Sequence, residues 1–551
     1  MFIIHPPHFL PPRGQRARAL AVALLILAPL MYGALAVALG QDANWDLRNY
    51  HFYNAYAFLN DRYGRDILPA QIPTFYNPLL DVPFFLAATH WPARLVGFLL
   101  GCVQGLNFVL LFFIAHATLI VPNPRHKVVV CAALAGLGVL GGEGIALVGT
   151  TFGDNIVSIG FLLSAALVAR HIESLAIGPA RRAFILALFF GVPAGLMMGL
   201  KLPGVIYCAG LCGGFLFASG TAMRRVMLCF AFGLGIIAGV AVTYGDWGWF
   251  LYSHYGNPVF PYFNNVFHSP LEGAGNVEDT QYVPHGWRDI LTLPFVFAHN
   301  PWRVGEIAWR DWRLPILYVV LPVAVFLRLF FGRNRAASDR IAAPYAARYL
   351  IAAFALSYAA WVALFAIYRY AVTMEMIAPL LIVLAVGMLP LKVTTRGLVA
   401  AFILAAVTAS IQPGDWHRRA TWTAHYVEAK IPALGDTSDL MILMASDEPY
   451  SHLVPEFPAN ISFIRVQSNF ASPEQGFGID KVMQARIDAH FKTGGRFMAL
   501  LPPWRMDQGA AALRAFGLTL ETQNCQTVTD ILYDNTAMKL CAVKYNESKI
   551  P

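Results

Sequence analysis

The residues of this chain that are best placed to do chemistry are four charged side chains that stand beside apolar runs. Asp46 follows the first long apolar run, and Asp154, Lys201 and Arg369 each lie between two later runs. A carboxylate can take a proton from a reacting hydroxyl, and lysine and arginine can hold a phosphate. Ionisable groups at the ends of membrane spans are costly unless they face an aqueous cavity or a partner. We therefore predict that these residues line one cavity at a membrane surface.

Each of these residues also has a purely structural interpretation. Asp46 can be a solvated loop acid paired with Arg48, and Lys201 and Arg369 can be anchors whose charged ends reach the membrane surface. Two further acids stand near the same apolar runs. Glu143 can line the cavity or be an ordinary loop acid, and Glu375 is predicted to be a buried structural partner of a basic group.

The composition is that of an integral membrane protein. Of the 551 residues, 57% are hydrophobic and only 13% are charged, with a mean hydropathy of +0.54. A soluble protein of ordinary composition carries about a quarter charged residues. The net charge of +8 lies in short basic clusters between apolar runs, as in cytoplasmic loops, which argues against a nucleic-acid partner.

Apolar runs of spanning length predict about eleven transmembrane helices. They lie near residues 19–39, 95–119, 128–147, 154–169, 183–200, 202–220, 226–245, 314–332, 349–368, 371–391 and 397–412. If the first span begins in the cytoplasm, the connection after each even-numbered span is cytoplasmic. Every one of these connections carries Lys or Arg, as cytoplasmic loops do. The first run also resembles a signal peptide, but its length favours an uncleaved span.

This arrangement predicts a transmembrane domain over residues 1–415 with two long outer loops, 41–92 and 246–312. Apolar residues of the first loop fit an amphipathic helix that lies on the membrane. They are Leu47, Tyr50, Phe52, Tyr53, Tyr56 and Leu59.

A soluble α/β domain outside the membrane is predicted over residues 435–551. Short apolar runs predict strands, and helical periodicity predicts two helices. The strands are Leu440–Met444, Ile461–Val466 and Phe497–Leu501, and the helices are Ile479–Lys492 and Met506–Phe516. A hairpin is predicted from Gln526–Tyr533 and Met538–Tyr545 around Asp534-Asn535. Cys525 and Cys541 flank it and are either a disulfide or two separately buried thiols.

Taken together, these features resemble the GT-C glycosyltransferases, polytopic membrane enzymes that take sugars from polyprenyl-phosphate carriers. The resemblance covers most of residues 15–415 and lies in the architecture more than in strict motifs. Asp46 matches the first-loop acid of the family and Arg369 a carrier-phosphate arginine, whereas Lys201 and Asp154 match less closely. The C-terminal domain has no Trp-Trp-Asp signature, which argues against glycosylation of peptides.

The resemblance implies transfer of a sugar from a polyprenyl-phosphate donor to an extracytoplasmic glycan, lipid or cell-envelope acceptor, with inversion at the anomeric carbon. The implied catalytic residues are Asp46, as general base, and Asp154. The residues expected to bind the substrate and the carrier phosphate are Arg369, Lys201, Arg48, Tyr370 and Asn49.

Several alternatives stay open at this point. Asp46 and Asp154 could together hold a divalent cation, since carboxylate oxygens are hard ligands; no other cofactor is indicated. A non-enzymatic translocator of lipid-linked glycans, or a polysaccharide polymerase or ligase, would also need phosphate-binding cations near a membrane. The expected location is the bacterial cytoplasmic membrane, with the C-terminal domain on the outer side.

Overall fold

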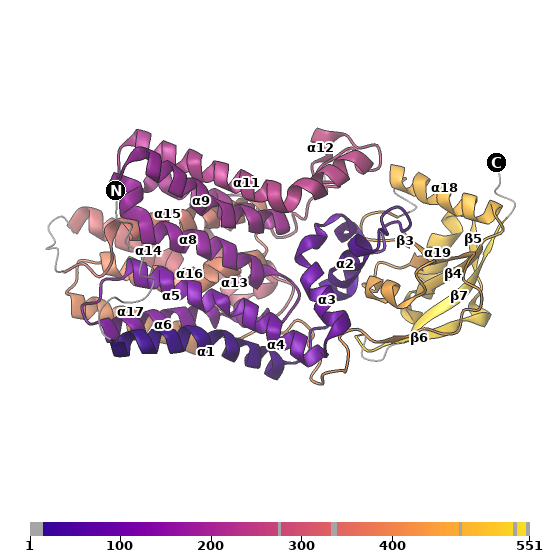
Figure 1. Ribbon diagram of the computed structural model, residues 1–551, viewed down its shortest axis with the longest axis horizontal. Coiled ribbons are helices and arrows are strands. Elements are labelled where there is room, and N and C mark those ends of the chain that lie inside the picture. The colour runs from indigo at the N-terminus through magenta and orange to yellow at the C-terminus, as the bar shows by residue number, and fades with distance from the viewer. Residues whose placement is uncertain (1–14, 274–276, 332–338, 473–475, 533–536, 547–551) are drawn as a thin grey trace. The chain divides into compact units, whose positions relative to one another are not determined.

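The computed structural model describes residues 15–273, 277–331, 339–472, 476–532 and 537–546 (Figure 1). Contacts between these residues divide the chain into two compact units. The helical unit contains the described residues of 1–39, 97–243 and 279–416, and the sheet unit contains those of 40–96, 244–278 and 417–551. Each unit is therefore built from three separate stretches of the chain.

The helical unit consists mainly of apolar helices. Its helices are α1 (Gln15–Leu39), α5 (Leu106–Thr118), α6 (Pro124–Val139), α7 (Gly142–Ala146), α8 (Asp154–Ile177), α9 (Ala180–Leu200), α10 (Val205–Gly213), α13 (Trp287–His299), α14 (Arg313–Phe331), α15 (Pro344–Leu364), α16 (Val372–Met388) and α17 (Val393–Ala409). Helices α4 (Ala93–Gln104) and α11 (Ala222–Tyr255) begin in one unit and end in the other.

The described residues include eight helical stretches that are long and apolar enough to cross a membrane. They are Gln15–Leu39, Ala93–Thr118, Asp154–Ile177, Ala180–Leu200, Ala222–Tyr255, Arg313–Phe331, Pro344–Leu364 and Tyr368–Met388. The other three predicted spans coincide with the shorter helices α6, α10 and α17. This helical content is that of a membrane protein, whereas the number of spans and their orientation stay predictions.

Helix α16 lies at the centre of the helical unit. It packs against α6, α8, α14 and α17, and nearly all of its side chains are buried. A helix that is apolar on every side is stable only when other helices surround it or when it faces lipid. The buried position of α16 fixes the turn that precedes it, Tyr368–Ala371, which carries Arg369.

Helices α9 and α11 approach each other closely through glycines. Gly191 and Gly195 of α9 lie against Gly235 and Gly239 of α11, and a Cβ on Gly195 would collide with the carbonyl oxygen of Ile236. Small residues spaced by four allow such backbone contact between apolar helices. The contact fixes α9, whose last residue is followed directly by Lys201.

The sheet unit contains a seven-stranded mixed sheet with the strand order β1-β6-β7-β4-β2-β3, and β5 also pairs with β7. The strands are β1 (Ala429–Lys430), β2 (Leu440–Ala445), β3 (Ser462–Gln467), β4 (Arg496–Leu501), β5 (Leu518–Leu520), β6 (Gln526–Asp530) and β7 (Met538–Tyr545). Strand β2 is parallel to β3 and β4, while β7 is antiparallel to β4, β5 and β6. The two predicted helices are α18 (Gly478–Lys492) and α19 (Met506–Ala515).

Both faces of the sheet are covered, which explains why β2 is an unbroken apolar run. Leu440, Ile442 and Met444 belong to one core cluster, and the alternating residues Met441 and Leu443 belong to another. Side chains of α18 and α19 fill the second cluster. Strands buried on both faces read as continuous apolar runs rather than as alternating ones.

The other face of the sheet is covered by the first long loop, and this corrects the prediction of a helix on the membrane surface. The segment is helical, as a π-helical turn Leu47–His51 and helix α2 (Phe52–Leu59). However, Leu47, Phe52 and Tyr53 are buried in the core cluster that includes Leu440 and Ile442. Their apolar face therefore packs within the sheet unit and is not available to lipid.

Hydrogen bonds fasten this loop to the sheet. The Arg62 guanidinium pairs with Asp66 at 2.7 Å and donates to the carbonyl oxygens of Ala459 and Ile461 at 2.5 and 2.6 Å. The Asp66 carboxylate also accepts from the backbone N–H of Phe463 at 2.9 Å. The buried ion pair is thus satisfied by backbone groups from β3 and its approach, which is the condition under which such pairs are tolerated in a protein interior.

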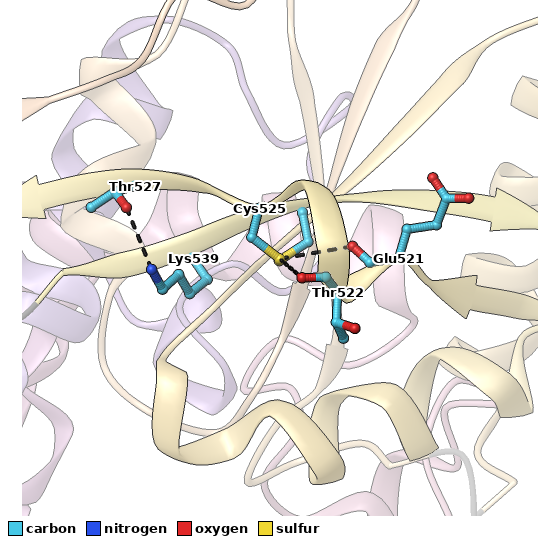
Figure 2. Close-up of a disulfide and its surroundings, with 6 residues drawn as sticks. Glu521, Thr522, Cys525, Thr527 and Lys539 are labelled. Carbon is cyan, nitrogen blue, oxygen red and sulfur yellow. Dashed lines mark hydrogen bonds between the residues drawn. A yellow bond between two sulfur atoms is a disulfide. The ribbon is translucent and has the colours of Figure 1, made fainter.

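The predicted C-terminal hairpin is confirmed as the pair β6 and β7, and the disulfide between Cys525 and Cys541 is confirmed with it (Figure 2). The two Cα atoms lie 4.1 Å apart. Lys539 Nζ of β7 lies 3.5 Å from the Thr527 hydroxyl of β6, beside the bridge. The predicted turn residues Asp534-Asn535 lie outside the described residues.

We expect the disulfide to stabilise the sheet unit measurably. The bridge spans 16 residues, and a loop of that length contributes about 3 kcal/mol through the unfolded state. Cys525→Ala with Cys541→Ala should lower the unfolding free energy of the sheet unit by about that amount. Cys102→Ala, which removes a free cysteine of the helical unit, is the control. Alkylation of all seven cysteines in denaturant without reductant would contradict the pairing.

Candidate functional site

Three of the predicted site residues lie at breaks between helices of the helical unit. Asp154 is the first residue of α8 and follows Gly153, whose φ of +79° favours glycine. Lys201 is an extended residue between α9 and the short helical turn Leu202–Gly204. Arg369 lies in the turn between α15 and α16. Each break places a charged side chain at a helix end rather than in an apolar helix middle.

The structure brings these three side chains together on one carboxylate. Lys201 Nζ donates to Asp154 Oδ1 at 2.8 Å, and Arg369 Nε lies 3.8 Å from Asp154 Oδ2. The side chains are only 5% exposed for Asp154, 14% for Lys201 and 11% for Arg369. Lys201 Nζ also donates to the carbonyl oxygen of Phe152 at 2.7 Å. We call Lys201, Asp154 and Arg369 the cation pair site.

Aromatic rings surround the two cations. The guanidinium carbon of Arg369 lies 4.2 Å from the ring centroid of Phe152, 5.5 Å from that of Trp416 and 5.8 Å from that of Tyr370. Lys201 Nζ lies 5.6 Å from the Tyr370 centroid. Such contacts attract a cation to the ring face and strengthen where water is excluded. They orient both cations and limit their access to water.

A small pocket opens beside Asp154 and Lys201. Its lining includes Tyr207, Tyr370 and Thr373. The Tyr207 hydroxyl donates to the Tyr370 carbonyl oxygen at 2.7 Å, which fixes the turn after Arg369 against α10. The pocket is therefore walled by phenol and hydroxyl groups as well as by the two charged residues.

The charges of the cation pair site favour an anionic ligand. One carboxylate faces two cations in a largely dehydrated environment. The N-terminus of α8, at Asp154, adds the partial positive charge of a helix end. Arginine and lysine in such surroundings bind phosphate through charge-assisted hydrogen bonds. Asp154, held between two cations, is better suited to positioning them than to accepting a proton.

Two other buried acids near this site are engaged in structural contacts. Glu375 Oε1 accepts from the backbone N–H of Gly144 at 2.9 Å, at the start of α7, and Glu143 Oε1 accepts from Trp416 Nε1 at 3.0 Å. The basic residue near Glu375 is Arg313, which reaches the Glu375 carbonyl oxygen at 3.4 Å. Glu143 therefore holds Trp416, the ring that lies beside Arg369.

Three further predicted site residues lie in the sheet unit, whereas Tyr370 lies beside Arg369 in the helical unit. Asp46 immediately precedes the π-helical turn and is partly exposed, and its Oδ2 accepts from the Tyr50 hydroxyl at 3.0 Å. Arg48 is also partly exposed. Asn49 is fully buried, and its amide donates to the carbonyl oxygen of Ala70 at 3.1 Å. Asp46 and Arg48 thus keep some access to solvent, whereas Asn49 is engaged in the interior of the sheet unit.

Phe152 and Trp416, which flank Arg369, could not be recognised as site residues from the sequence. Phe152 stands two residues before Asp154, and Trp416 follows the last apolar run. An aromatic residue near a membrane surface is common, so composition gave no reason to separate these from other interfacial rings. Only the folded chain brings them to one guanidinium.

The structure offers no ready-made metal centre within its described residues: no group of three or more His, Cys, Asp or Glu side chains there is arranged to hold an ion. Asp154 uses its carboxylate on Lys201 and Arg369 instead. The predicted divalent cation therefore stays a prediction, to be tested by chelation.

Comparison with known proteins does not assign this chain to a class, so its class has to be inferred from its own fold and site. No protein-family model matches it, and no curated protein matches it. What the structure defines is a helical membrane protein with an additional α/β sheet unit, and a buried pair of cations on one carboxylate in its helical unit.

Proposed function

We propose that the chain is a membrane glycosyltransferase that takes a sugar from a polyprenyl-phosphate donor and transfers it to an extracytoplasmic glycan, lipid or cell-envelope acceptor. The observation that carries the proposal is the cation pair site. Lys201 and Arg369 are held on one carboxylate among apolar helices. A phosphate that is attached to a membrane lipid is the ligand that suits both the charge and the surroundings.

The proposed reaction needs little beyond charge stabilisation and a base. The bond between the anomeric carbon and the carrier phosphate breaks, and polyprenyl phosphate leaves with the electron pair. Arg369 and Lys201 stabilise the charge that develops on the phosphate oxygens. The acceptor oxygen forms the new bond from the opposite side, which inverts configuration, and its proton passes to the Asp46 carboxylate. Asp154 holds the two cations in position.

The proposal includes a location. We place the chain in the bacterial cytoplasmic membrane with the sheet at the C-terminus outside the cytoplasm, in keeping with the basic clusters of alternate loops. The disulfide between Cys525 and Cys541 supports an oxidising compartment for this part. Thr493→Cys provides an exposed label, in a background from which the free cysteines are removed. Labelling by an impermeant thiol reagent only after cell lysis would contradict the placement.

The test of the proposed function is transfer by the purified chain in detergent. The donors are a panel of radiolabelled sugars on polyprenyl phosphate, and the acceptors are extracted cell-envelope glycans and lipids. We expect label to move from the lipid fraction to an acceptor fraction. Addition of a chelator decides whether a divalent cation takes part. A translocator has no turnover without two compartments, so carrier binding without transfer from any donor would contradict the proposal. A polymerase or ligase would instead give products of increasing length or transfer of whole chains.

A further inference from the structure

A second recess lies in the helical unit, at the end of helix α13. Its empty volume is about 1130 Å³, which includes space open to solvent. Three short segments of the chain form it, residues 299–302, 308–310 and 412–413. It is not part of the pocket beside Lys201 and shares no lining residue with it.

Local hydrogen bonds fix the walls of this recess. Helix α13 ends at His299, and the Asn300 side chain accepts from the backbone N–H of Trp302 at 3.2 Å, which starts the short turn Pro301–Arg303. Arg310 and Gln412 pair through both backbone hydrogen bonds, at 2.9 and 3.0 Å. The lining is thus held by backbone pairing, which leaves its side chains to serve a ligand.

Two tryptophans give the recess an exposed ring and a rigid wall. Trp302 is 59% exposed, a large value for a tryptophan. Trp309 is 4% exposed, and its ring lies 3.9 Å, centroid to centroid, from that of Tyr368. Tyr368 directly precedes Arg369 in the chain, so the rigid wall of the recess leads to the turn that carries a cation of the cation pair site.

The polar side chains of the recess are available for binding. In the part of the chain that the structure describes, the side chains of His299, Arg310 and Gln412 make no hydrogen bond or ion pair with protein. No carboxylate is among the lining residues, so Arg310 is the permanent charge there. A recess with one exposed ring, side-chain amides and an uncompensated guanidinium suits a polar ligand with a flat apolar face and, at one end, a negative charge.

We propose that this recess binds a saccharide, with an acidic one favoured over a neutral one. The apolar face of a sugar ring would stack on Trp302, as amphipathic ligands do on exposed tryptophans. The amides of Asn300 and Gln412 would bond hydroxyl groups, and Arg310 would bind a carboxylate or phosphate on the sugar. The binding stands on this geometry alone; the further assignment, that the recess holds the acceptor glycan, rests on the proposed transferase function.

The test measures saccharide binding to the full chain in lipid nanodiscs, because common maltoside detergents carry sugar headgroups themselves. The probes are neutral gluco- and manno-oligosaccharides and oligogalacturonates, detected by saturation-transfer NMR and titration. Trp302→Ala should weaken binding of every probe that binds by about tenfold, a difference of 1.4 kcal/mol. Arg310→Gln should weaken the binding of oligogalacturonates by a similar factor and the binding of the neutral probes much less.

Trp287→Ala is the matched control, because Trp287 is 67% exposed at the other end of α13 and does not line the recess. The proposal would be overturned if the Trp302→Ala and Trp287→Ala variants bound the probes with equal affinity, or if the unaltered chain bound no probe. The two proposals can fail separately. If the chain binds saccharides but transfers no sugar from any donor, the transferase proposal fails. If the chain transfers sugar but its saccharide binding does not depend on Trp302, the proposal for the recess fails.

Discussion

Replacing Arg369 by alanine is expected to weaken the binding of polyprenyl phosphate by about 10- to 100-fold, because the carrier phosphate loses a charge-assisted donor in a largely dehydrated site. Arg369→Lys should recover only part of the loss. The guanidinium presents a planar fork of donors and packs on the Phe152 ring at 4.2 Å, whereas an ammonium is a point charge. Lys201→Met should weaken the same binding while leaving Asp154 its contact with Arg369. Affinity is measured with the purified chain in nanodiscs.

The control for this series is Arg496→Ala, which removes an arginine that pairs with Asp439 in the sheet unit at 2.9 Å. It should leave carrier affinity unchanged. If Arg369→Ala and Arg369→Lys both retained normal affinity with folding intact, Arg369 would be an anchor at the membrane surface. The proposed phosphate site would then be lost.

Replacing Asp46 by asparagine is expected to lower turnover by about 10²- to 10⁴-fold, the usual cost of removing a general base. Asparagine has nearly the same size and can still accept the hydrogen bond from the Tyr50 hydroxyl, but it cannot take the acceptor proton. Carrier affinity and folding should survive, because the base acts on the acceptor. The measurement is the transfer assay under saturating donor, together with carrier binding.

Asp61→Asn provides the matched control, since Asp61 is an exposed acid of the same loop whose backbone has a φ of 49° that asparagine tolerates. Near-normal turnover of Asp46→Asn would refute its role as base. If carrier affinity fell as much as turnover, Asp46 would instead have a structural role in the first loop.

Much of the fold could be predicted from the sequence because its signals are local. Long apolar runs give the candidate spans, and short apolar runs give β2, β3 and β4. Strands β1 and β5 are two and three residues long, too short for any periodicity to indicate them. What could not be predicted is how separate stretches assemble, since each unit draws on three parts of the chain.

The first loop illustrates the limit most clearly. An amphipathic pattern reports that a helix has an apolar face but not what covers that face. Leu47 and Tyr53 have the spacing of a membrane-surface helix, yet the structure buries them in the core of the sheet unit. The partner of an apolar face depends on contacts between residues hundreds of positions apart, such as Arg62 with Ile461.

The candidate site was predicted residue by residue but not as a set of contacts. In the sequence, Asp154, Lys201 and Arg369 each lie between two apolar runs, which marks them as candidates. That one carboxylate would hold both cations follows only from the packing of α8, α9 and α16. This packing is the reason why we propose that Asp154, which the resemblance implies to be catalytic, positions the two cations.

The most direct test of the central claim is an experimental structure of the chain with bound polyprenyl phosphate. The phosphate is the one group whose position decides between a catalytic site and a set of structural ion pairs. We predict phosphate oxygens at hydrogen-bond distance, about 3 Å, from Arg369 and Lys201. A phosphate bound elsewhere, with both cations still held on Asp154 and no other ligand on them, would contradict the account.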